Sequence, residues 1–428
     1  MIIMKFGGTS LSTPERRELA AARVLEHAHG GTYRAEPEQV VVVVSAMGRR
    51  GDPYATDTLL DLFSPFSAAR EVPARESDAM AACGEEISAA LFAALLNARG
   101  ARAVSMRGFQ AGVITDAVHR DAQITELRPA RVLAALRRGE VVVVAGFQGT
   151  SLEGGVTCIG RGGSDTTAMA LGVALGATRI EIFTDVDGVM TADPRVVPGA
   201  RSVEHLGFEE SAEMAFKGSK VLHPAAAELI RSRGGTEGAN GTKKRTDDAS
   251  RPKIVIRNTL SEASGTWLVS EDERISLQAD APSAATSVTS SCGIAQISVT
   301  GIDFLEELAT LERVFGVIAE RGVSLDMMSI LPDRVAFTCA RASVGLVATE
   351  LSTLGVTFTV KNDVAKVTLV GGGIHGVPGI MHRMVRALCS AGIGVYQSVD
   401  SNMIVGVLIP ERRVDDAVRA LHEEFFGE

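Results

Sequence analysis

The sequence has few aromatic side chains, with one Trp and three Tyr among 428 residues. Proteins that hold single-stranded nucleic acid stack the bases on such rings. The formal net charge of −9 is also of the wrong sign for neutralising phosphates along a nucleic acid or the surface of an anionic membrane. The composition therefore argues against a nucleic-acid partner and against a membrane partner.

Clustered cysteines are missing as well. The five cysteines are odd in number and scattered, and no CxxC or Cys/His cluster occurs: they are Cys83, Cys158, Cys292, Cys339 and Cys389. Neither a disulfide framework nor a zinc site is indicated by this spacing. We expect all five to be small buried side chains of a protein in the reducing cytoplasm.

Long hydrophobic runs are absent too. The longest, such as Val40 to Val44, are the length of a β-strand, whereas a membrane-spanning helix needs about 20 apolar residues. The N-terminus carries Lys5 and then glycines and a polar turn, without the apolar core of a signal peptide. The sequence therefore predicts a cytoplasmic protein.

Short β-branched runs alternate along the first half with stretches rich in Ala and Leu. The runs at 40–44, 141–145 and 180–183 predict buried parallel strands, and the stretches at 14–28, 79–98, 129–137 and 165–175 predict helices. This alternation is typical of an α/β fold with a doubly wound, mainly parallel sheet. Ligands bind such sheets beyond the carboxyl ends of the strands.

An internal repeat occupies the C-terminal third. Residues 297–330 and 367–400 each read as strand, glycine turn, amphipathic helix, glycine and strand, and each is followed by a further strand and helix. This plan predicts two ferredoxin-like βαββαβ modules in tandem. We therefore expect a domain at 1–269, a linker at 270–291 and modules at 292–360 and 361–428. The polar stretch 234–252 predicts an exposed loop within the first domain.

The stretch KFGGTS, residues 5–10, combines a lysine with two glycines. Glycines allow backbone N–H groups to approach an anion closely, and the following helix adds its positive end. The order differs from a P-loop, because Lys5 precedes the glycines instead of following them. Alone, the stretch is equally compatible with a tight turn beside a surface lysine.

The stretch GRGGSDTTA, residues 160–168, precedes an alanine-rich helix. Arg161 offers a planar fork suited to a carboxylate, and Gly162 and Gly163 expose backbone donors. We expect Ser164 and Asp165 at the N-cap position of the helix. A cap alone does not need Arg-Gly-Gly before it, so we favour a binding site.

Two further stretches are polar turns. FTDVDGVMTADPR, residues 183–195, follows a predicted strand, where a nucleotide or a metal would be held, although an ordinary pair of turns would read the same. Its Asp-x-Asp-Gly lacks the Glu at position twelve of a calcium loop. In KGSKVLHP, residues 217–224, we expect His223 to be structural, since it precedes a helix-starting proline.

Together these stretches resemble the amino acid kinase superfamily, and within it the aspartate kinase family. KFGGTS, VVVVSAMG, CGEEIS, AGFQGTS, GRGGSDTTA, FTDVDGVMTADPR and GSKVLHP follow the family's order over the first 225 residues. The repeat resembles the paired ACT domains of that family, and GRRGDPYATDTLL resembles its diaminopimelate-sensitive type. The resemblance implies an amino acid kinase fold followed by two ACT modules.

The resemblance also implies the reaction and its residues. ATP and L-aspartate would give ADP and 4-phospho-L-aspartate, the first step toward lysine, threonine and methionine. Mg²⁺ would be held mainly by the phosphates, with no metal ligand from the protein. Lys5 and Asp165 would be catalytic, and Ser45, Thr56, Glu85, Arg161, Gly162, Gly163 and Ser164 would bind the amino acid. The ATP site would comprise Lys5, Phe6, Gly7, Gly8, Ser10, Thr184, Asp185, Met190, Asp193, Arg195 and Lys220.

Regulation and assembly follow from the ACT resemblance. It implies an amino-acid effector and a homodimer or larger assembly, and it leaves open whether a separate ACT-only subunit joins. Three features depart from the family: the polar stretch 234–252, Met190 in place of a tyrosine, and a first ACT copy without the Pro378-Gly379 turn of the second. An amino-acid-sensing regulatory subunit with weak catalysis, or a kinase of glutamate or acetylglutamate, are the alternatives.

Overall fold

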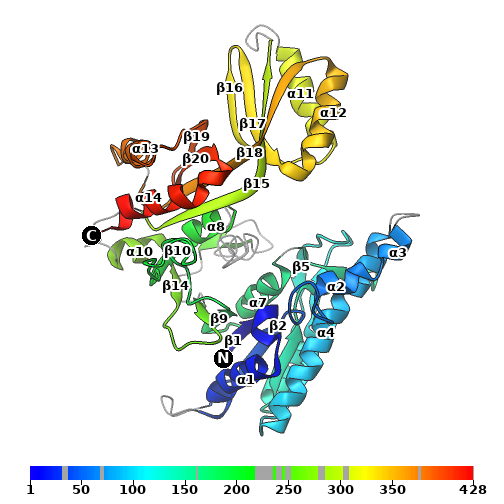
Figure 1. The fold of residues 1–428 in the computed structure, drawn as a ribbon. Coiled ribbons are helices and arrows are strands. Elements are labelled where there is room, and N and C mark those ends of the chain that lie inside the picture. The colour runs from blue at the N-terminus through cyan, green and yellow to red at the C-terminus, as the bar shows by residue number, and fades with distance from the viewer. Residues whose placement is uncertain are drawn as a thin grey trace. The chain divides into compact units, whose positions relative to one another are not determined.

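The structure is a computed structural model. It describes residues 1–30, 37–67, 72–160, 162–216, 235–237, 243–245, 252–277, 285–301, 308–374 and 377–427. The chain forms two compact units, shown in Figure 1. The N-terminal unit contains residues 1–189, 202–216 and the described part of 220–279, and the C-terminal unit contains residues 190–201 and the described part of 280–428.

An eight-stranded sheet forms the centre of the N-terminal unit, in the order β10-β14-β13-β9-β1-β2-β6-β3. Its four middle strands are parallel and strongly apolar: β9 (Arg179–Thr184), β1 (Ile2–Phe6), β2 (Val40–Val44) and β6 (Val141–Ala145). The outer strands are β3 (Ala103–Met106), β13 (Lys253–Asn258), β14 (Thr266–Val269) and β10 (His205–Gly207). Only the β13–β14 pair of this sheet is antiparallel. The predicted α/β fold with a mainly parallel sheet is confirmed.

Helices cover both faces of the sheet. Alternate strand residues such as Met4 and Phe6 form a core with α1 (Pro14–His29) and α4 (Ala74–Ala98). The intervening residues, among them Ile3, face α7 (Gly163–Ala174) on the other side, where Gly172 of α7 allows close packing. Lys5 alternates with Met4 and Phe6, so its side chain also points toward α7.

Smaller elements complete the unit. They are η1 (Gly8–Leu11), α2 (Thr56–Asp61), α3 (Ser64–Ser67), α5 (Gly108–Ala111), α6 (Ala130–Arg137) and α8 (Phe208–Phe216). A second sheet has the order β5-β4-β7-β8, from β4 (Val113–Thr115), β5 (Ile124–Leu127), β7 (Gln148–Ser151) and β8 (Val156–Cys158). The strands predicted at 40–44, 141–145 and 180–183 and the helices predicted at 14–28, 79–98, 129–137 and 165–175 are thus present, with ends shifted by a few residues. The helix expected from Pro224 lies outside the described residues.

Among the described helices, α4 is long and apolar enough to cross a membrane by length and composition. Half of its most apolar window is buried inside the structure. That buried face, which includes Phe92 and Leu96, packs in the core beside β3 and β6. The helix is therefore a core element of this unit, and in Figure 1 it is the longest cyan ribbon.

Two long antiparallel strands, β15 (Ser287–Thr300) and β18 (Thr357–Val370), run through the C-terminal unit. They are the middle of a six-stranded sheet, β16-β17-β15-β18-β20-β19. The other strands are β16 (Asp326–Leu331), β17 (Arg334–Ala340), β19 (Gln397–Asp400) and β20 (Ile404–Pro410). The helices are α11 (Leu308–Glu320), α12 (Val344–Leu354), α13 (Ile380–Ser390) and α14 (Val414–Phe426). The two predicted βαββαβ modules are therefore present.

The modules are nested, which differs from the tandem boundaries 292–360 and 361–428. The first half of β15 pairs with the second half of β18 and belongs to the second module, whose core includes Val288. The second half of β15 belongs to the first module, whose core includes Ile297 and Val299. Strand pairing across the whole of β15 and β18, which the repeat does not show, sets this arrangement.

Three other stretches depart from the predicted domains. Residues 190–201 lie in the C-terminal unit instead of the domain expected at 1–269. The expected linker 270–291 contains α10 (Glu271–Leu277) and the start of β15. Within 234–252, an antiparallel pair forms from β11 (Gly235–Glu237) and β12 (Lys243–Arg245) instead of a loop alone, while most other residues of that stretch lie outside the described residues.

Candidate active site

The polar motifs meet at one edge of the eight-stranded sheet. In the registers of β9, β1, β2 and β6, Phe6 lies opposite Val44 and Phe183, and Val44 lies opposite Ala145. The turns that follow these strands therefore emerge side by side at their carboxyl ends. A pocket of about 250 Å³ opens between them, lined by Lys5, Gly8, Ser45, Ala46, Gly48, Arg49, Arg50, Ala55, Thr56, Asp57, Glu85, Phe147, Gly162, Gly163, Ser164 and Asp165.

The deepest charged pair of this pocket joins Lys5 and Asp165. Lys5 Nζ lies 2.7 Å from Asp165 Oδ1, and each side chain is 12% exposed. Asp165 is the third residue of α7, and Gly162 occupies the N-cap position without a side-chain cap. The predicted N-cap position of Ser164 and Asp165 is therefore wrong. The Asp165 carboxylate faces the ammonium of Lys5 because both residues lie on the same side of the sheet.

Two glycines of the pocket make close contacts that a side chain would block. A Cβ on Gly8 would lie 2.4 Å from the carbonyl oxygen of Ala46, and one on Gly163 would lie 2.9 Å from the Phe147 ring. The N–H of Gly48 donates to the Gly8 carbonyl at 2.9 Å. The turns after β1 and β2 are thereby held together, with little room for any other residue at Gly8.

Glu85 extends from α4 into the pocket and is 3% exposed. Its Oε1 accepts a hydrogen bond from the N–H of Ala46 at 3.1 Å, while Oε2 is buried without a hydrogen bond from any described residue. Burial raises the pKa of Glu85 to about 8, although hydrogen bonds from the Ala46 N–H and from the Thr56 side chain oppose the shift. A ligand that brings a positive charge to this carboxylate would satisfy its second oxygen.

Two arginines after β2 were not identified from the sequence. Arg49 Nη2 lies 2.9 Å from Asp185 Oδ2, and Arg50 forms two hydrogen bonds with Asp61 of α2, at 3.1 and 2.7 Å. The available signal was their place in the polar stretch GRRGD at the carboxyl end of a predicted strand.

Several predicted nucleotide-site residues lie away from the pocket lining. The Phe6 ring is fully buried and stacks on Phe183 with ring centroids 4.7 Å apart, so its side chain is part of the core. Ser10 is 1% exposed, and its hydroxyl accepts a hydrogen bond from Thr259 at 2.7 Å. The Gly7 N–H donates to the Phe183 carbonyl. The side chains of Phe6 and Ser10 and the backbone N–H of Gly7 therefore support the turn after β1 and do not point into the pocket.

Others lie elsewhere or are not described. Thr184 ends β9, and Asp185 follows it beside Arg49. Met190, Asp193 and Arg195 belong to the C-terminal unit, where Asp193 and Arg195 pair with each other. Arg161 and Lys220 lie outside the described residues, as does His223. Their assignment to the site stays a prediction from the sequence.

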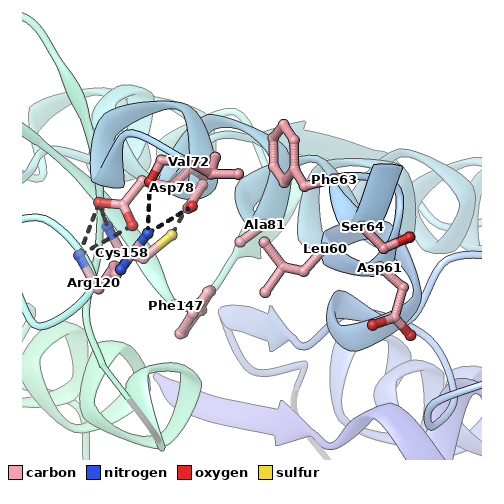
Figure 2. A pocket seen from close by; sticks show the side chains of 11 residues that line it. Leu60, Asp61, Phe63, Ser64, Val72, Asp78, Ala81, Arg120, Phe147 and Cys158 are labelled. Atoms are coloured by element: carbon pink, nitrogen blue, oxygen red, sulfur yellow. Dashed lines mark hydrogen bonds between the residues drawn. The ribbon is translucent and has the colours of Figure 1, made fainter. Parts of the chain in front are cut away.

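A larger cavity of about 500 Å³ lies in the same unit (Figure 2) and is mostly apolar, with Leu60, Phe63, Val72, Ala81, Phe147 and Cys158 in its lining. Its buried carboxylate, Asp78, accepts hydrogen bonds from the N–H groups of Arg120 and Cys158 and interacts with His119 Nδ1 at 2.8 Å. Asp78 therefore fixes the surrounding chain. Of the residues in the motifs quoted from the sequence, only Leu60 and Phe147 border this cavity, so the smaller pocket is the candidate active site.

The cysteines divide between two environments. Cys158 and Cys339 are buried as expected, whereas Cys83, Cys292 and Cys389 are exposed, which corrects the expectation that all five are buried. Burial raises the pKa of the Cys158 thiol and keeps it protonated.

Comparison with known proteins identifies the family. Residues 1–237 match the family model described as amino acid kinase family, and residues 367–425 match an ACT domain. Aspartokinase 1 of Bacillus subtilis is 38% identical over 437 residues, covering 99% of this chain and 98% of that protein. The aspartokinase of Mycolicibacterium smegmatis is 37% identical over 438 residues, covering 99% and 96%.

A solved structure shares the fold. Escherichia coli aspartokinase III, in complex with aspartate and ADP, superimposes with a TM-score of 0.77 at 23% identity and full coverage of both chains. The family model, the two full-length relatives and the pocket at the carboxyl edge of the sheet agree, and the chain belongs to the aspartokinase family of amino acid kinases.

Proposed function

We propose that this protein is an aspartate kinase that transfers the γ-phosphoryl group of ATP to the side-chain carboxylate of L-aspartate. The observation that carries the proposal is the Lys5–Asp165 pair, which lies in one pocket with Gly8 and Glu85. A buried cation beside a glycine turn suits a phosphoryl group, and a buried carboxylate suits an ammonium group.

The amino acid would lie on the Glu85 side of the pocket. Its ammonium group would meet Glu85 Oε2, which has no hydrogen bond from a described residue. The hydroxyl groups of Ser45, Thr56 and Ser164, which line the same pocket, would donate to its carboxylates. Arg161, as the sequence predicts, would clamp one carboxylate with its planar fork.

Phosphoryl transfer needs positioning and charge neutralisation more than acid–base chemistry. A side-chain oxygen of aspartate attacks the γ-phosphorus, and the bond from that phosphorus to the oxygen bridging toward ADP breaks. The attacking carboxylate is already ionised at neutral pH, so no general base is required. Lys5 would stabilise the charge on the transferring group, and Asp165 would hold the Lys5 ammonium in place.

Mg²⁺ would accompany the phosphates. Among the described residues, no group of three or more His, Cys, Asp or Glu side chains converges as in a metal site built by the protein alone. Mg²⁺ usually keeps several water ligands and is bound through substrate phosphates and one or two carboxylates. The bound ion would supply charge neutralisation on the phosphate oxygens.

The nested ACT modules would regulate this activity. We propose that an amino-acid effector binds to them and that they pair between chains, because βαββαβ modules present sheet edges such as β16 and β19. The identity of the effector, an ACT-only partner subunit and the cytoplasmic location stay predictions from the sequence.

The decisive experiment measures ADP release from Mg-ATP with L-aspartate, L-glutamate or no acceptor, for wild type and Lys5→Ala. Aspartate-dependent release that is lost in the variant is the expected result. Faster ADP release with L-glutamate than with L-aspartate would identify glutamate as the acceptor. If neither L-aspartate nor L-glutamate stimulated ADP release while the protein still bound an amino acid, the alternative of a regulatory, amino-acid-sensing subunit would replace the kinase proposal.

A further inference from the structure

We propose that Arg49 is a further catalytic residue of this kinase, whose guanidinium binds the phosphoryl group during transfer. The inference rests on the proposed kinase function and adds a residue to its site. In the structure Arg49 lines the pocket that contains Lys5, Gly8 and Asp165. Its Nη2 pairs with Asp185 Oδ2 at 2.9 Å.

The order of the strands places this ion pair beside the Gly7-Gly8 turn. Arg49 lies in the turn after β2, and Asp185 follows β9, while β1 lies between these two strands. The Gly7-Gly8 turn follows β1, so it emerges between the two partners of the ion pair. The Arg49 side chain therefore reaches from one flanking strand to the other at the place where a glycine turn would receive phosphates.

The backbone of Arg49 is fixed, whereas its charged group is accessible. The Gly48 N–H donates to the Gly8 carbonyl, and the Arg49 N–H donates to Asp52 Oδ2 at 2.8 Å. Gly48 adopts a φ of +88°, which favours glycine at this turn. The Arg49 side chain is nevertheless 74% exposed. Its guanidinium can therefore exchange partners without movement of the main chain.

The substrates bring negative charge to the pocket, and Arg49 can neutralise part of it. Lys5 is already paired with Asp165, and Arg50 is held by two hydrogen bonds to Asp61. A nucleotide triphosphate and an aspartate carboxylate together bring several negative charges. An exposed ion pair such as Arg49–Asp185 contributes little to stability, so a phosphate can displace the Asp185 carboxylate at small cost. The guanidinium, with five N–H donors, can also bind both groups at once.

In the step proposed here, Arg49 donates hydrogen bonds to the equatorial oxygens of the transferring phosphoryl group. The oxygen–phosphorus bond to aspartate forms as the bond to ADP breaks, and Arg49 neither gains nor loses a proton. Its contribution is electrostatic and is larger in the transition state than in the ground state. The main effect of its removal is therefore expected on kcat.

The test compares Arg49→Ala, Arg49→Lys and Asp185→Asn in the full-length protein. Removal of one such donor reduces kcat by about 100- to 1,000-fold, and we expect Arg49→Ala to fall in this range, with Arg49→Lys in between. Asp185→Asn removes the charge of the same ion pair but keeps the guanidinium. Because the sequence assigns Asp185 to the ATP site, we expect a higher KM for ATP in this variant, with a loss of kcat much smaller than that of Arg49→Ala. Guanidinium ion added at millimolar concentration should partly restore Arg49→Ala.

Arg138→Ala is the matched control, because Arg138 is also an exposed arginine paired with a carboxylate, that of Glu140. If Arg49→Ala and Asp185→Asn lost kcat equally and guanidinium did not restore Arg49→Ala, Arg49 would serve only as a partner in a structural ion pair. This result would overturn the proposal. Circular dichroism and Tm of each variant exclude unfolding as the cause.

Measurements of nucleotide binding test this inference independently of the kinase proposal. Calorimetry with a non-hydrolysable ATP analogue and with ADP is carried out on wild type and Arg49→Ala. Loss of analogue affinity by tenfold or more, with a smaller loss for ADP, supports contact with the terminal phosphate even if aspartate is not the acceptor. Unchanged analogue affinity together with unchanged kcat contradicts the inference while aspartate-dependent turnover upholds the kinase.

Discussion

Lys5 on the first strand and Asp165 at the start of α7 form an ion pair of 2.7 Å inside the active-site pocket. Both side chains are nearly buried, so each depends on the other for its position and its charge. Removal of one partner leaves the other uncompensated. The pair therefore shows how α7 fixes the ammonium group of a lysine that precedes the glycines, in the position where we propose that it binds phosphate.

Lys5→Ala should reduce kcat by about 100-fold or more, because it removes the cation nearest the transferring group. Asp165→Asn keeps the size of the side chain but frees the Lys5 ammonium, and we expect a loss of kcat together with a smaller change in KM for ATP. Steady-state ADP release checks both variants. Activity of Asp165→Asn equal to wild type would show that the carboxylate does not position Lys5.

Glu85 should make aspartate binding depend on pH. With a pKa of about 8 in the free site, Glu85 is protonated at neutral pH, whereas an ammonium ligand favours the carboxylate form. Binding then requires loss of a proton, so the KM for aspartate should fall as pH rises from 6 to 8, by up to about tenfold per pH unit, and become constant above.

Glu85→Gln is the variant that checks this dependence. It keeps the shape of the side chain and cannot ionise, so KM for aspartate should be high and nearly constant between pH 6 and 8. Measurement of KM for ATP in the same samples serves as the control. An unchanged slope of aspartate KM against pH in Glu85→Gln would assign the titration to another group.

The sequence predicts most of the secondary structure and the place of the pocket for physical reasons. The valine runs of β2 and β6 favour buried parallel strands, and polar turns after neighbouring parallel strands lie at one edge of the sheet. The ends of α1 are equally clear, since Thr13 accepts the N-terminal hydrogen bond from Arg16 and Gly30 follows the helix.

What the sequence does not predict depends on contacts between distant segments. The nested modules arise because β15 and β18 pair over their whole length, and a repeat shows similarity but not pairing. From its local sequence Asp165 reads as a helix cap, and only the family resemblance, not the spacing of the residues, predicts that it acts together with Lys5. The role proposed for Arg49 depends on its ion pair with Asp185, which the sequence does not reveal.

Gly7 and Gly8 should respond differently to alanine. A Cβ on Gly7 would lie 3.6 Å from Lys5 Nζ, an ordinary contact, whereas one on Gly8 would lie 2.4 Å from the Ala46 carbonyl oxygen. We expect Gly8→Ala to lower the Tm clearly, because backbone must move to relieve the overlap, and Gly7→Ala to lower it little. Thermal unfolding by circular dichroism measures both.

Gly345 in α12 provides the control for this pair. A Cβ there has open space, and alanine in a helix is favoured over glycine by about 0.5–1 kcal/mol. Gly345→Ala should therefore leave the Tm unchanged or raise it slightly. Equal Tm values for Gly7→Ala and Gly8→Ala would mean that the turns after β1 and β2 are not held as tightly as the structure shows.

His422 of α14 should influence nucleotide binding through residues 190–201. Its Nε2 lies 2.9 Å from the Thr191 hydroxyl, which also accepts a hydrogen bond from the Arg201 N–H. Burial lowers the pKa of His422, so the imidazole is neutral, and its Nε2 shares a hydrogen bond with the Thr191 hydroxyl. The same short segment contains Asp193 and Arg195, which the sequence assigns to the ATP site.

His422→Ala should therefore raise the KM for ATP by several-fold, since the loss of a buried hydrogen bond costs about 1–3 kcal/mol, while kcat changes little. His422→Gln, which can offer an acceptor near the position of Nε2, should recover part of the wild-type KM. His29→Ala, at an exposed histidine of α1, is the control. A fall in kcat without a change in KM would contradict this route, because a segment that only holds the nucleotide affects its binding and not the chemical step.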